Sequence, residues 1–298
     1  MTVRDPIGIT GSTGGFGPLP ITGPPVADFV AGFSIEATPK QLERVGALET
    51  RLPAGTSVFV PFLPRAIMSD TARACLRLSN AGLRPVPHLT ARAMPSRTRL
   101  AESLSQLAEA GADSLLLIAG DRRRAAGPYK STLGIFDSGL LQHYGFRHIA
   151  VAGHPEGHRA AGDDVLFAAL REKSAYARET GSTMWVVTQF AFAADPVLTW
   201  LRRLGDEGVY LPVRIGMPGP AKVQTLIRYA VQCGVGASSH MLARRPGAVS
   251  RLLGRWSPDE MLHTLAPHSG ASSELPIEGV HVFPFGGLLE SIDFFTRQ

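Results

Sequence analysis

Cysteine is scarce in this chain, which excludes a fold held together by disulfide bonds. Among 298 residues only Cys75 and Cys233 are cysteines. Two cysteines are too few for a disulfide framework, so we expect a reducing, cytoplasmic environment. Both lie in apolar stretches with a helical pattern, and we therefore expect both to be buried free thiols.

Long apolar runs are also missing. No run approaches the roughly 20 residues that a membrane-spanning helix needs, and the first residues do not have the basic and then apolar pattern of a signal peptide. We therefore expect neither a membrane partner nor a signal peptide.

Acidic residues are outnumbered by basic ones, which gives a net charge of +5. Such a surplus can favour nucleic acid, but the arginines are spread over expected helices and aromatic residues do not lie between them. The densest basic cluster is Arg122-Arg123-Arg124, in one expected loop. We expect no nucleic-acid partner, and a small anionic ligand fits the charge better.

Glycine and proline are concentrated near the start of the chain. Residues 5–25 read DPIGITGSTGGFGPLPITGPP, which predicts an extended arm over residues 1–28. These glycines do not follow a strand and open a helix, so they do not form a phosphate-binding loop.

The rest of the chain alternates between two patterns. Apolar, β-branched runs predict strands at 29–35, 57–62, 84–90, 114–119, 148–153, 183–190, 211–217 and 279–285. Helical periodicity lies between most of them, at 40–50, 70–81, 97–110, 137–144, 163–180, 195–207 and 220–233, and again at about 287–296. Ser96 and Asp195 are expected helix starts, and Gly82, Gly111, Gly181 and Gly234 are expected helix ends.

Eight strands that alternate with helices predict an α/β fold of the (β/α)8 TIM barrel type. The barrel is expected over residues 29–298 as a single unit, with a mostly helical excursion at about 235–278. An open doubly wound sheet is the alternative, but the glycine-rich turn that it requires after its first strand is absent.

Active sites of such barrels lie at the carboxyl ends of the strands. Several polar residues follow the predicted strands: Glu36, His88, Thr90, Asp121, His154, Glu156, His158, Thr188 and Gln189. Each alone is more often a solvated loop residue, but groups from several strands converge on one cavity.

Metal binding and nucleophilic catalysis are both poorly supported. His154 and His158 are spaced as in a zinc-binding helix, but Pro155 and Gly157 place them in a loop, so we expect no metal site. A Gly-x-Ser-x-Gly nucleophile turn is absent, and neither cysteine follows a strand.

These strand ends resemble those of the methylenetetrahydrofolate reductases, flavin-dependent barrels of one-carbon metabolism. The similarity runs in order from about residue 29 to the end of the sequence. Its motifs are Phe33-Ser34-Ile35-Glu36, Pro87-His88-Leu89-Thr90, Gly120-Asp121, Pro155-Glu156-Gly157-His158, Thr188-Gln189-Phe190 and Gly279-Val280-His281-Val282-Phe283.

The resemblance implies hydride transfer through a flavin between 5,10-methylenetetrahydrofolate and 5-methyltetrahydrofolate. Glu36 would be the general acid or base, since partial burial favours the protonated form of a carboxyl group. The alternative is that Glu36 pairs with a nearby Arg or Lys. Asp121 would act beside the flavin and the pterin, and Gln189 and Phe283 would contact the folate.

The resemblance also implies a flavin site. FAD is the expected cofactor, although FMN fits the sequence too, and use of NAD(P)H stays open. The expected flavin-binding residues are His88, Thr90, Gly120, Asp121, Tyr129, His154, His158 and Lys173. Arg122 to Arg124 would meet a cofactor diphosphate or an acidic folate tail, or would simply be solvated, which we slightly favour.

Departures from the family cluster near the chemistry. Pro61 stands where the family has a threonine, and Val223 lies at about the position of a phenylalanine that stacks on nicotinamide or folate. Loss of that ring predicts a member that oxidises 5-methyltetrahydrofolate and passes electrons to oxygen or a protein rather than taking them from NADH. A flavin-free folate methyltransferase and a non-catalytic barrel subunit remain alternatives. We also expect a homo-oligomer, of a size that the sequence leaves open.

Overall fold

The computed structural model describes residues 24–63, 66–234, 254–270 and 273–298. Most of the predicted N-terminal arm, residues 1–23, lies outside these ranges, and so do residues 235–253 of the predicted excursion.

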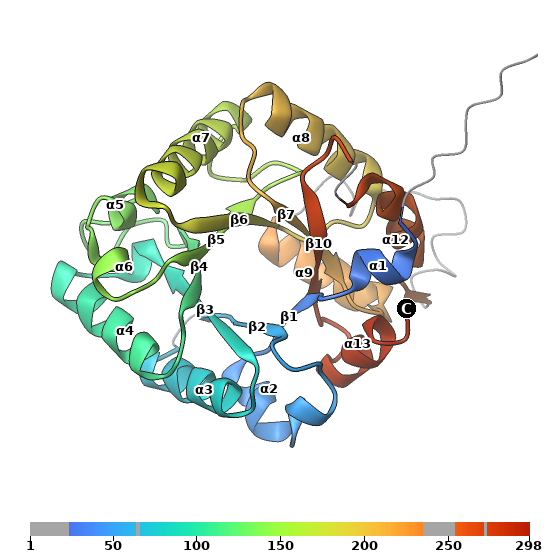
Figure 1. The fold of residues 1–298 in the computed structure, drawn as a ribbon, viewed down its shortest axis with the longest axis horizontal. Coiled ribbons are helices and arrows are strands. Elements are labelled where there is room, and N and C mark those ends of the chain that lie inside the picture. The colour runs from blue at the N-terminus through green and yellow to red at the C-terminus, as the bar shows by residue number, and fades with distance from the viewer. Residues whose placement is uncertain (1–23, 64–65, 235–253, 271–272) are drawn as a thin grey trace, which may run out of the picture.

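Within the described ranges, eight parallel strands close into a barrel (Figure 1). Their order around the barrel is β1-β10-β7-β6-β5-β4-β3-β2, so β1 pairs with both β2 and β10. The strands are β1 (Ser34–Glu36), β2 (Ser57–Val60), β3 (Arg84–Thr90), β4 (Ser114–Ile118), β5 (His148–Gly153), β6 (Thr183–Thr188), β7 (Val213–Pro218) and β10 (Ile277–Phe283). The predicted (β/α)8 barrel is therefore confirmed.

Helices surround the barrel wall (Figure 1). They are α1 (Val26–Val30), α2 (Pro39–Arg44), α3 (Met68–Asn80), α4 (Arg97–Glu109), α5 (Leu133–Phe136), α6 (Leu140–His143), α7 (Asp163–Thr180), α8 (Ala194–Asp206), α12 (Asp259–Leu265) and α13 (Leu288–Phe295). Short 3-10 turns lie at Leu48–Thr50, Ala91–Ala93 and Ala266–His268.

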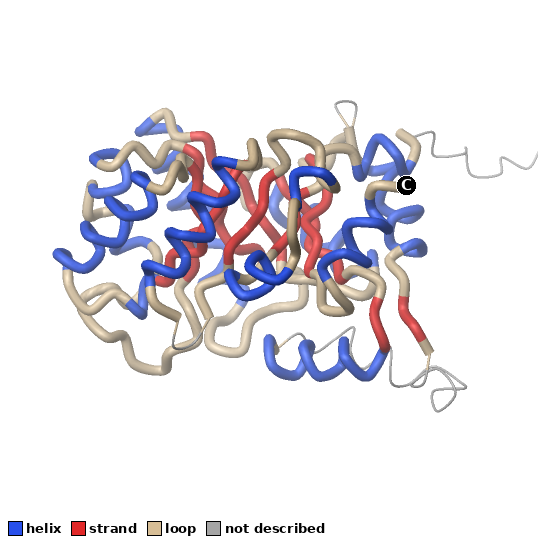
Figure 2. The backbone as a smooth tube through the Cα atoms, turned by 90° about the horizontal axis from the view of Figure 1, so that it is seen from below, coloured by secondary structure: helices blue, strands red, loops and turns tan. Residues whose placement is uncertain are grey.

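Helix α9 (Val223–Cys233) is placed differently. It lies beyond one end of the barrel rather than against its wall, next to the two-stranded sheet of β8 (Ala221–Lys222) and β9 (Arg255–Trp256) (Figure 2). The helix packs Leu226 and Ala230 against aromatic side chains that follow β6 and β10. It therefore covers part of the end at which the strands terminate.

Two apolar layers follow from the alternation of side chains along each strand. Phe59, Val86, Leu116, Ala150 and Val187, one from each of five strands, form a buried cluster inside the barrel. The side chains of opposite orientation, such as Ile35 and Leu117, pack against the helices in the main core. Because apolar residues fill the barrel interior, polar groups are gathered near its carboxyl end.

Some predicted elements differ from the observed ones. The predicted first strand at 29–35 is shortened, because α1 occupies its first two residues and Gly32, at φ 67°, turns the chain before β1 begins. The predicted helix at 137–144 is instead the shorter α6, which begins after Gly139 at φ 67°, and α5 lies just before the predicted range. The described part of the excursion contains β9 as well as α12.

Candidate active site

Glu36 lies at the end of β1 and faces two histidines. Its Oε1 atom is 3.5 Å from Nε2 of His88, on β3, and 3.9 Å from Nε2 of His281, on β10. The Glu36 side chain is 18% exposed, whereas His281 is fully buried. Within the described ranges, no Arg or Lys lies within ion-pair distance of this carboxylate. The alternative that Glu36 serves in a pair with a basic side chain therefore loses its support.

His281 is held by a second polar residue of β1. Its Nδ1 atom is 2.9 Å from Oγ of Ser34, and both residues are buried. Its ring contacts that of Phe59 edge-on, with 4.4 Å between ring centroids. These contacts fix the imidazole so that its other nitrogen points at Glu36. No hydrogen-bond partner is found for Nε2 of either histidine within the described ranges.

Both histidines are neutral at pH 7. Burial lowers the pKa of His88 to about 4, although the nearby charge of Glu36 opposes this shift. Burial is also the main cause that lowers the pKa of His281, again opposed by Glu36. Glu36 therefore faces two uncharged rings that can exchange hydrogen bonds with it, and not a fixed positive charge.

His281 has a place in the site that the sequence prediction did not give it. The residue was part of the quoted Gly279-Val280-His281-Val282-Phe283 motif, but no role was assigned to it. Alternation along β10 was the available signal, since Gly279, His281 and Phe283 share one face of the strand. Ser34, two residues before Glu36, shares the face of β1 in the same way.

Thr90 and Gly120 form a close contact between the ends of β3 and β4. Gly120 has φ 85°, and a Cβ atom on it would lie 2.0 Å from Cγ2 of Thr90. Only glycine fits there without displacing Thr90. Oγ1 of Thr90 is buried and has no hydrogen-bond partner among the described residues, so it is available to a ligand.

Tyr129, on the loop that follows β4, is buried at 6% exposure.

His154, His158 and Lys173 lie together beyond β5. The two imidazole rings are 4.8 Å apart and meet edge-on, so the predicted loop brings the pair together although it is not helical. Burial lowers the pKa of His154 to about 3, helped by the nearby charges of His158 and Lys173. His154 is therefore uncharged at neutral pH.

Lys173 is a buried cation on α7, with 7% of its surface exposed. Burial lowers its pKa to about 8, and Glu172 partly opposes this shift. No carboxylate pairs with it within the described ranges. A buried ammonium group without an ion pair is costly unless a ligand supplies the negative charge. Lys173 and the unsatisfied Thr90 hydroxyl therefore fit a flavin that carries phosphate.

Asp121 and Gln189 lie at the same opening but differ in their surroundings. Asp121 is exposed. Burial is the main cause that raises the pKa of the Cys233 thiol, and the charges of Glu36 and Asp121 add to it, so both carboxylates lie within electrostatic range of Cys233. Nε2 of Gln189 donates a hydrogen bond of 3.2 Å to the carbonyl oxygen of Cys233. Its amide nitrogen is thus engaged by the end of α9.

Cys233 itself corrects an expectation. Cys75 is buried as predicted, but Cys233 is exposed. The helical pattern around Cys233 is real, but α9 packs only one face against the barrel, and Cys233 lies at the helix end. The helix ends at Gly234, with φ 75°, and Arg159 donates a 2.6 Å hydrogen bond to the carbonyl of Gln232.

Phe283 is part of an aromatic group at the end of β10. Its ring centroid lies 4.8 Å from that of His281 and 5.5 Å from that of Phe190. It is only half-buried, so one part of the ring remains available to a ligand beside Glu36.

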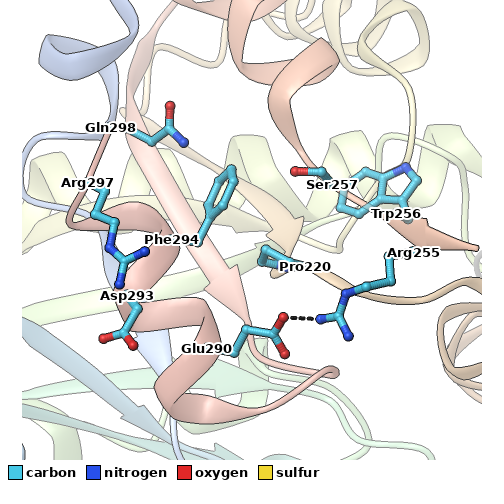
Figure 3. Close-up of a pocket in the computed structure, with 9 residues that line it drawn as sticks. All are labelled: Pro220, Arg255, Trp256, Ser257, Glu290, Asp293, Phe294, Arg297 and Gln298. Carbon is cyan, nitrogen blue, oxygen red and sulfur yellow. Dashed lines mark hydrogen bonds and ion pairs between the residues drawn. The ribbon is translucent and has the colours of Figure 1, made fainter.

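A separate pocket lies between β9 and α13 (Figure 3). Arg255 points at Glu290 across it, and the two form an ion pair. Asp293, on the same helix, pairs with Arg51 at 3.4 Å. Most charges of this pocket are therefore neutralised within the protein, and none of the predicted site residues lines it.

Two further observations concern the described ranges. They hold no group of three or more His, Cys, Asp or Glu side chains arranged to bind a metal ion. None of their helices combines the length and the apolar character needed to cross a bilayer.

Comparison with known proteins gives one family and a set of similar folds. The family described as "Methylenetetrahydrofolate reductase" matches residues 42–247. Triosephosphate isomerase from Bartonella henselae is 12% identical, with a TM-score of 0.48, and the match covers 89% of this chain and 99% of that one. Dihydropteroate synthase from Thermus thermophilus is 14% identical, with a TM-score of 0.43 and coverage of 89% and 92%.

A conserved protein of unknown function from Enterococcus faecalis is also similar. It is 10% identical, with a TM-score of 0.46. The match covers 88% of this chain but only 64% of that protein, less than two thirds of its length.

Proposed function

Because the chain belongs to the methylenetetrahydrofolate reductase family, we propose that it is a flavin-dependent oxidoreductase that interconverts 5,10-methylenetetrahydrofolate and 5-methyltetrahydrofolate. Family membership by itself supports a folate-related oxidoreductase. The finer proposal rests on one observation: Glu36 is partly buried at the barrel mouth between two neutral histidines, without a basic partner in the described part of the chain.

Glu36 is the proposed proton carrier. In the reducing direction its carboxyl group would protonate N10, the folate nitrogen that leaves the methylene carbon while N5 of the pterin keeps it, and in the oxidising direction its carboxylate would take that proton back. His88 and His281 keep the group oriented through their free Nε2 atoms, and Ser34 fixes the His281 ring. A cation in place of either histidine would hold Glu36 ionised and prevent it from acting as an acid.

The remaining site residues hold the two ligands. The flavin would be bound by Thr90, Gly120, Tyr129, His154, His158 and Lys173, with Lys173 at its phosphate. Bound there, the flavin supplies the acceptor or donor of hydride. Asp121 and Phe283 would contact the pterin, and Gln189 would do so after it releases the Cys233 carbonyl. The cofactor is proposed to be FAD, with FMN as the smaller alternative.

The proposed physiological direction is oxidation of 5-methyltetrahydrofolate. The support is Val223, which stands at about the position of the family's stacking phenylalanine and is buried at 6% exposure. A buried valine offers no ring to a nicotinamide. Electrons would then pass to oxygen or to a partner protein, and NAD(P)H would be a poor donor.

The test is the visible spectrum of the purified protein with added FAD or FMN, before and after anaerobic 5-methyltetrahydrofolate. We expect flavin bands that bleach. Glu36→Gln should bind flavin normally but bleach at least about 100-fold more slowly, since a positioned acid or base contributes about 10²–10⁴-fold. Glu102→Gln, an exposed residue that pairs with Arg99 on α4, is the matched control and should behave as the wild type.

Three results would contradict the proposal. A colourless protein that takes up neither flavin would remove the oxidoreductase and leave a methyltransferase or a non-catalytic barrel. Wild-type bleaching in Glu36→Gln would remove its role in proton transfer. Rapid reduction by NADH, with none by 5-methyltetrahydrofolate, would reverse the proposed direction.

A further inference from the structure

Three consecutive arginines line one hollow near the barrel mouth. Arg122, Arg123 and Arg124 follow Asp121 in the loop after β4, and together they line a cavity of about 750 Å³. All three are exposed. Consecutive side chains usually diverge, so a loop that turns all three toward one hollow concentrates positive charge in a small volume.

None of these arginines is neutralised within the described part of the chain, where no hydrogen bond or ion pair of their guanidinium groups is found. Many arginines elsewhere are paired, as Arg171 is with Glu207 and Arg214 with Glu278. The pocket between β9 and α13 also contains a paired arginine, because its Arg255 forms an ion pair with Glu290 (Figure 3). The arginine hollow, lined by Arg122, Arg123 and Arg124, is therefore a positively charged surface that an external anion could bind.

The backbone that carries the three arginines is braced. Arg92 donates from Nε to the carbonyl of Lys130 at 2.8 Å and from a guanidinium nitrogen to that of Arg122 at 3.2 Å. Its own carbonyl accepts a 2.9 Å bond from the amide of Ala126. Gly127 packs so closely that a Cβ atom would lie 2.1 Å from the carbonyl oxygen of Pro95. A fixed loop lowers the entropy cost of binding through these side chains.

The hollow adjoins the candidate active site. Asp121, the residue before the three arginines, lies within electrostatic range of Cys233, and so does Glu36. A ligand that reaches from the barrel interior past Asp121 would thus meet the arginines next. Guanidinium groups bind phosphate and carboxylate oxygens in pairs, which makes a cluster of them selective for groups with several negative charges.

We propose that Arg122, Arg123 and Arg124 form a binding site for a multiply charged oxyanion, a set of phosphate or carboxylate groups carried by a ligand of the barrel mouth. Its two possible sources rest on the proposed function: the diphosphate of a flavin dinucleotide, or the carboxylates of a glutamate chain on the folate. The hollow is distinct from Lys173, which is buried on α7.

The first experiment measures the anion site without either ligand. Tripolyphosphate and a glutamate pentapeptide are titrated calorimetrically at low ionic strength into the wild type, the triple variant Arg122→Ala/Arg123→Ala/Arg124→Ala, and a control. The control is Arg84→Ala/Arg147→Ala/Arg202→Ala, which removes the same charge from exposed arginines elsewhere. Circular dichroism verifies that all three are folded.

We expect the wild type and the control to bind at least one anion, and the triple variant to bind it at least about tenfold more weakly. Added salt should reduce this difference, because solvent-exposed charges are screened. Equal weakening in both triple variants would overturn the proposal, since the effect would then come from net charge alone. Absence of anion binding to the wild type would overturn it as well.

The second experiment separates the two sources. Dissociation constants are compared for FAD against lumiflavin, which lacks phosphate, and for triglutamyl against monoglutamyl 5-methyltetrahydrofolate. If the triple variant binds FAD more weakly but lumiflavin unchanged, the site belongs to the cofactor. If it binds the triglutamyl folate more weakly but the monoglutamyl folate unchanged, the site belongs to the substrate. Equal affinities of the triple variant and the control for all four would overturn the proposal.

Failure of the proposed function would look different. A wild type that binds tripolyphosphate through these arginines, but takes up neither flavin nor folate, would keep the anion site and remove the oxidoreductase.

Discussion

At the scale of single residues, Glu36 poses the main energetic question of the molecule. A carboxyl group that is mostly withdrawn from water is costly unless it is paired or hydrogen-bonded. Among the described residues, the ionisable groups within 4.0 Å of it are the imidazoles of His88 and His281, with Nε2 at 3.5 and 3.9 Å. Neutral imidazoles tolerate either protonation state of such a group, which is what a residue that both gives and takes a proton requires.

Ser34→Ala tests whether the second histidine is held in place. Loss of the Ser34 hydroxyl leaves Nδ1 of the fully buried His281 without its partner at 2.9 Å. An unsatisfied buried polar group costs about 1–3 kcal/mol, and we expect the free energy of unfolding in urea to fall by that amount. Ser105→Ala removes a hydroxyl that, among the described residues, donates to exposed Glu109, and it should change the free energy of unfolding by less than about 0.5 kcal/mol. Equal effects of the two substitutions would show that the Ser34–His281 contact is not stabilising.

Lys173 gives a prediction about cofactor binding and pH. Its pKa is lowered to about 8, so it is mostly charged at pH 7 and loses its charge as the pH rises through 8. We expect the dissociation constant for FAD, measured by fluorescence quenching between pH 6.5 and 9.5, to rise across that range. In Lys173→Met, binding should be weaker at pH 7 and this part of the pH dependence should disappear.

Lys222→Met is the control for that experiment, because Lys222 is exposed on β8. It should keep the wild-type pH profile. A profile centred well above pH 8 in the wild type, or unchanged in Lys173→Met, would separate Lys173 from the phosphate of the flavin.

At the scale of elements, the sequence predicted the helix ends and strand bounds that depend on interactions between neighbouring residues. Ser96 was an expected helix start, and its Oγ accepts a hydrogen bond from the amide of Arg99 at the start of α4. Gly181 and Gly234 were expected helix ends, and both adopt positive φ there. Strands β3 and β5 and helix α7 have the predicted bounds, because each combines a clear periodicity with a clear stop.

The elements that were missed depend on distant partners. Strand β8 exists only because Ala221 pairs with Trp256, far along the chain, and no local pattern shows such a pairing. The exposure of Cys233 follows from the position of α9 beyond the barrel rather than from its own periodicity. Likewise His281 enters the site because β10 closes the barrel against β1, which a strand pattern alone does not show.

The end of α9 is held over the barrel mouth by two side chains, which gives an element-scale prediction. Arg159 donates to the carbonyl of Gln232 and Gln189 to that of Cys233. In Arg159→Ala/Gln189→Ala we expect the last turn of α9 to open more often. Loss of about 1 kcal/mol of hydrogen bonding corresponds to about fivefold faster amide exchange there.

Hydrogen exchange read by mass spectrometry measures this effect on peptides that cover α9 and, as an internal reference, α4. Arg202→Ala, an exposed arginine on α8, is the control and should leave both unchanged. Uniform acceleration in α4 and α9 would indicate global destabilisation, and no acceleration in α9 would show that these bonds do not hold the helix.

At the scale of the whole molecule, the barrel explains why a site could be predicted from sequence at all. Strand order sets which ends meet, so Glu36 from β1 and His88 from β3 approach although 52 positions separate them in the numbering. The polar side chains of the site have apolar neighbours. Phe59, for example, contacts the rings of both His88 and His281. The same apolar surroundings make the stability of the protein depend on pH.

Acidification should lower the free energy of unfolding, because it protonates the buried histidines more readily in the unfolded chain than in the folded protein. His88 has a pKa of about 4 in the folded protein, against 6.5 for an ordinary histidine. Between these values the unfolded chain binds more protons, so the free energy of unfolding falls as the pH is lowered through this window. One such histidine contributes a slope of up to about 1.4 kcal/mol per pH unit, and His154, with a pKa lowered to about 3, acts in the same direction.

Urea unfolding at intervals between pH 6.5 and 5 measures this slope while most carboxylates remain ionised. His88→Gln keeps a polar side chain without a titrating group, so its slope should be smaller than that of the wild type by up to the contribution of one histidine. His143→Gln, at an exposed position on α6, should keep the full slope. If His88→Gln and His143→Gln behaved alike, His88 would be protonated in the folded protein as readily as in the unfolded chain. Glu36 would then face a cation in this range of pH and could not serve there as the proposed acid, so the same titration tests the stability of the barrel and the electrostatics of its site.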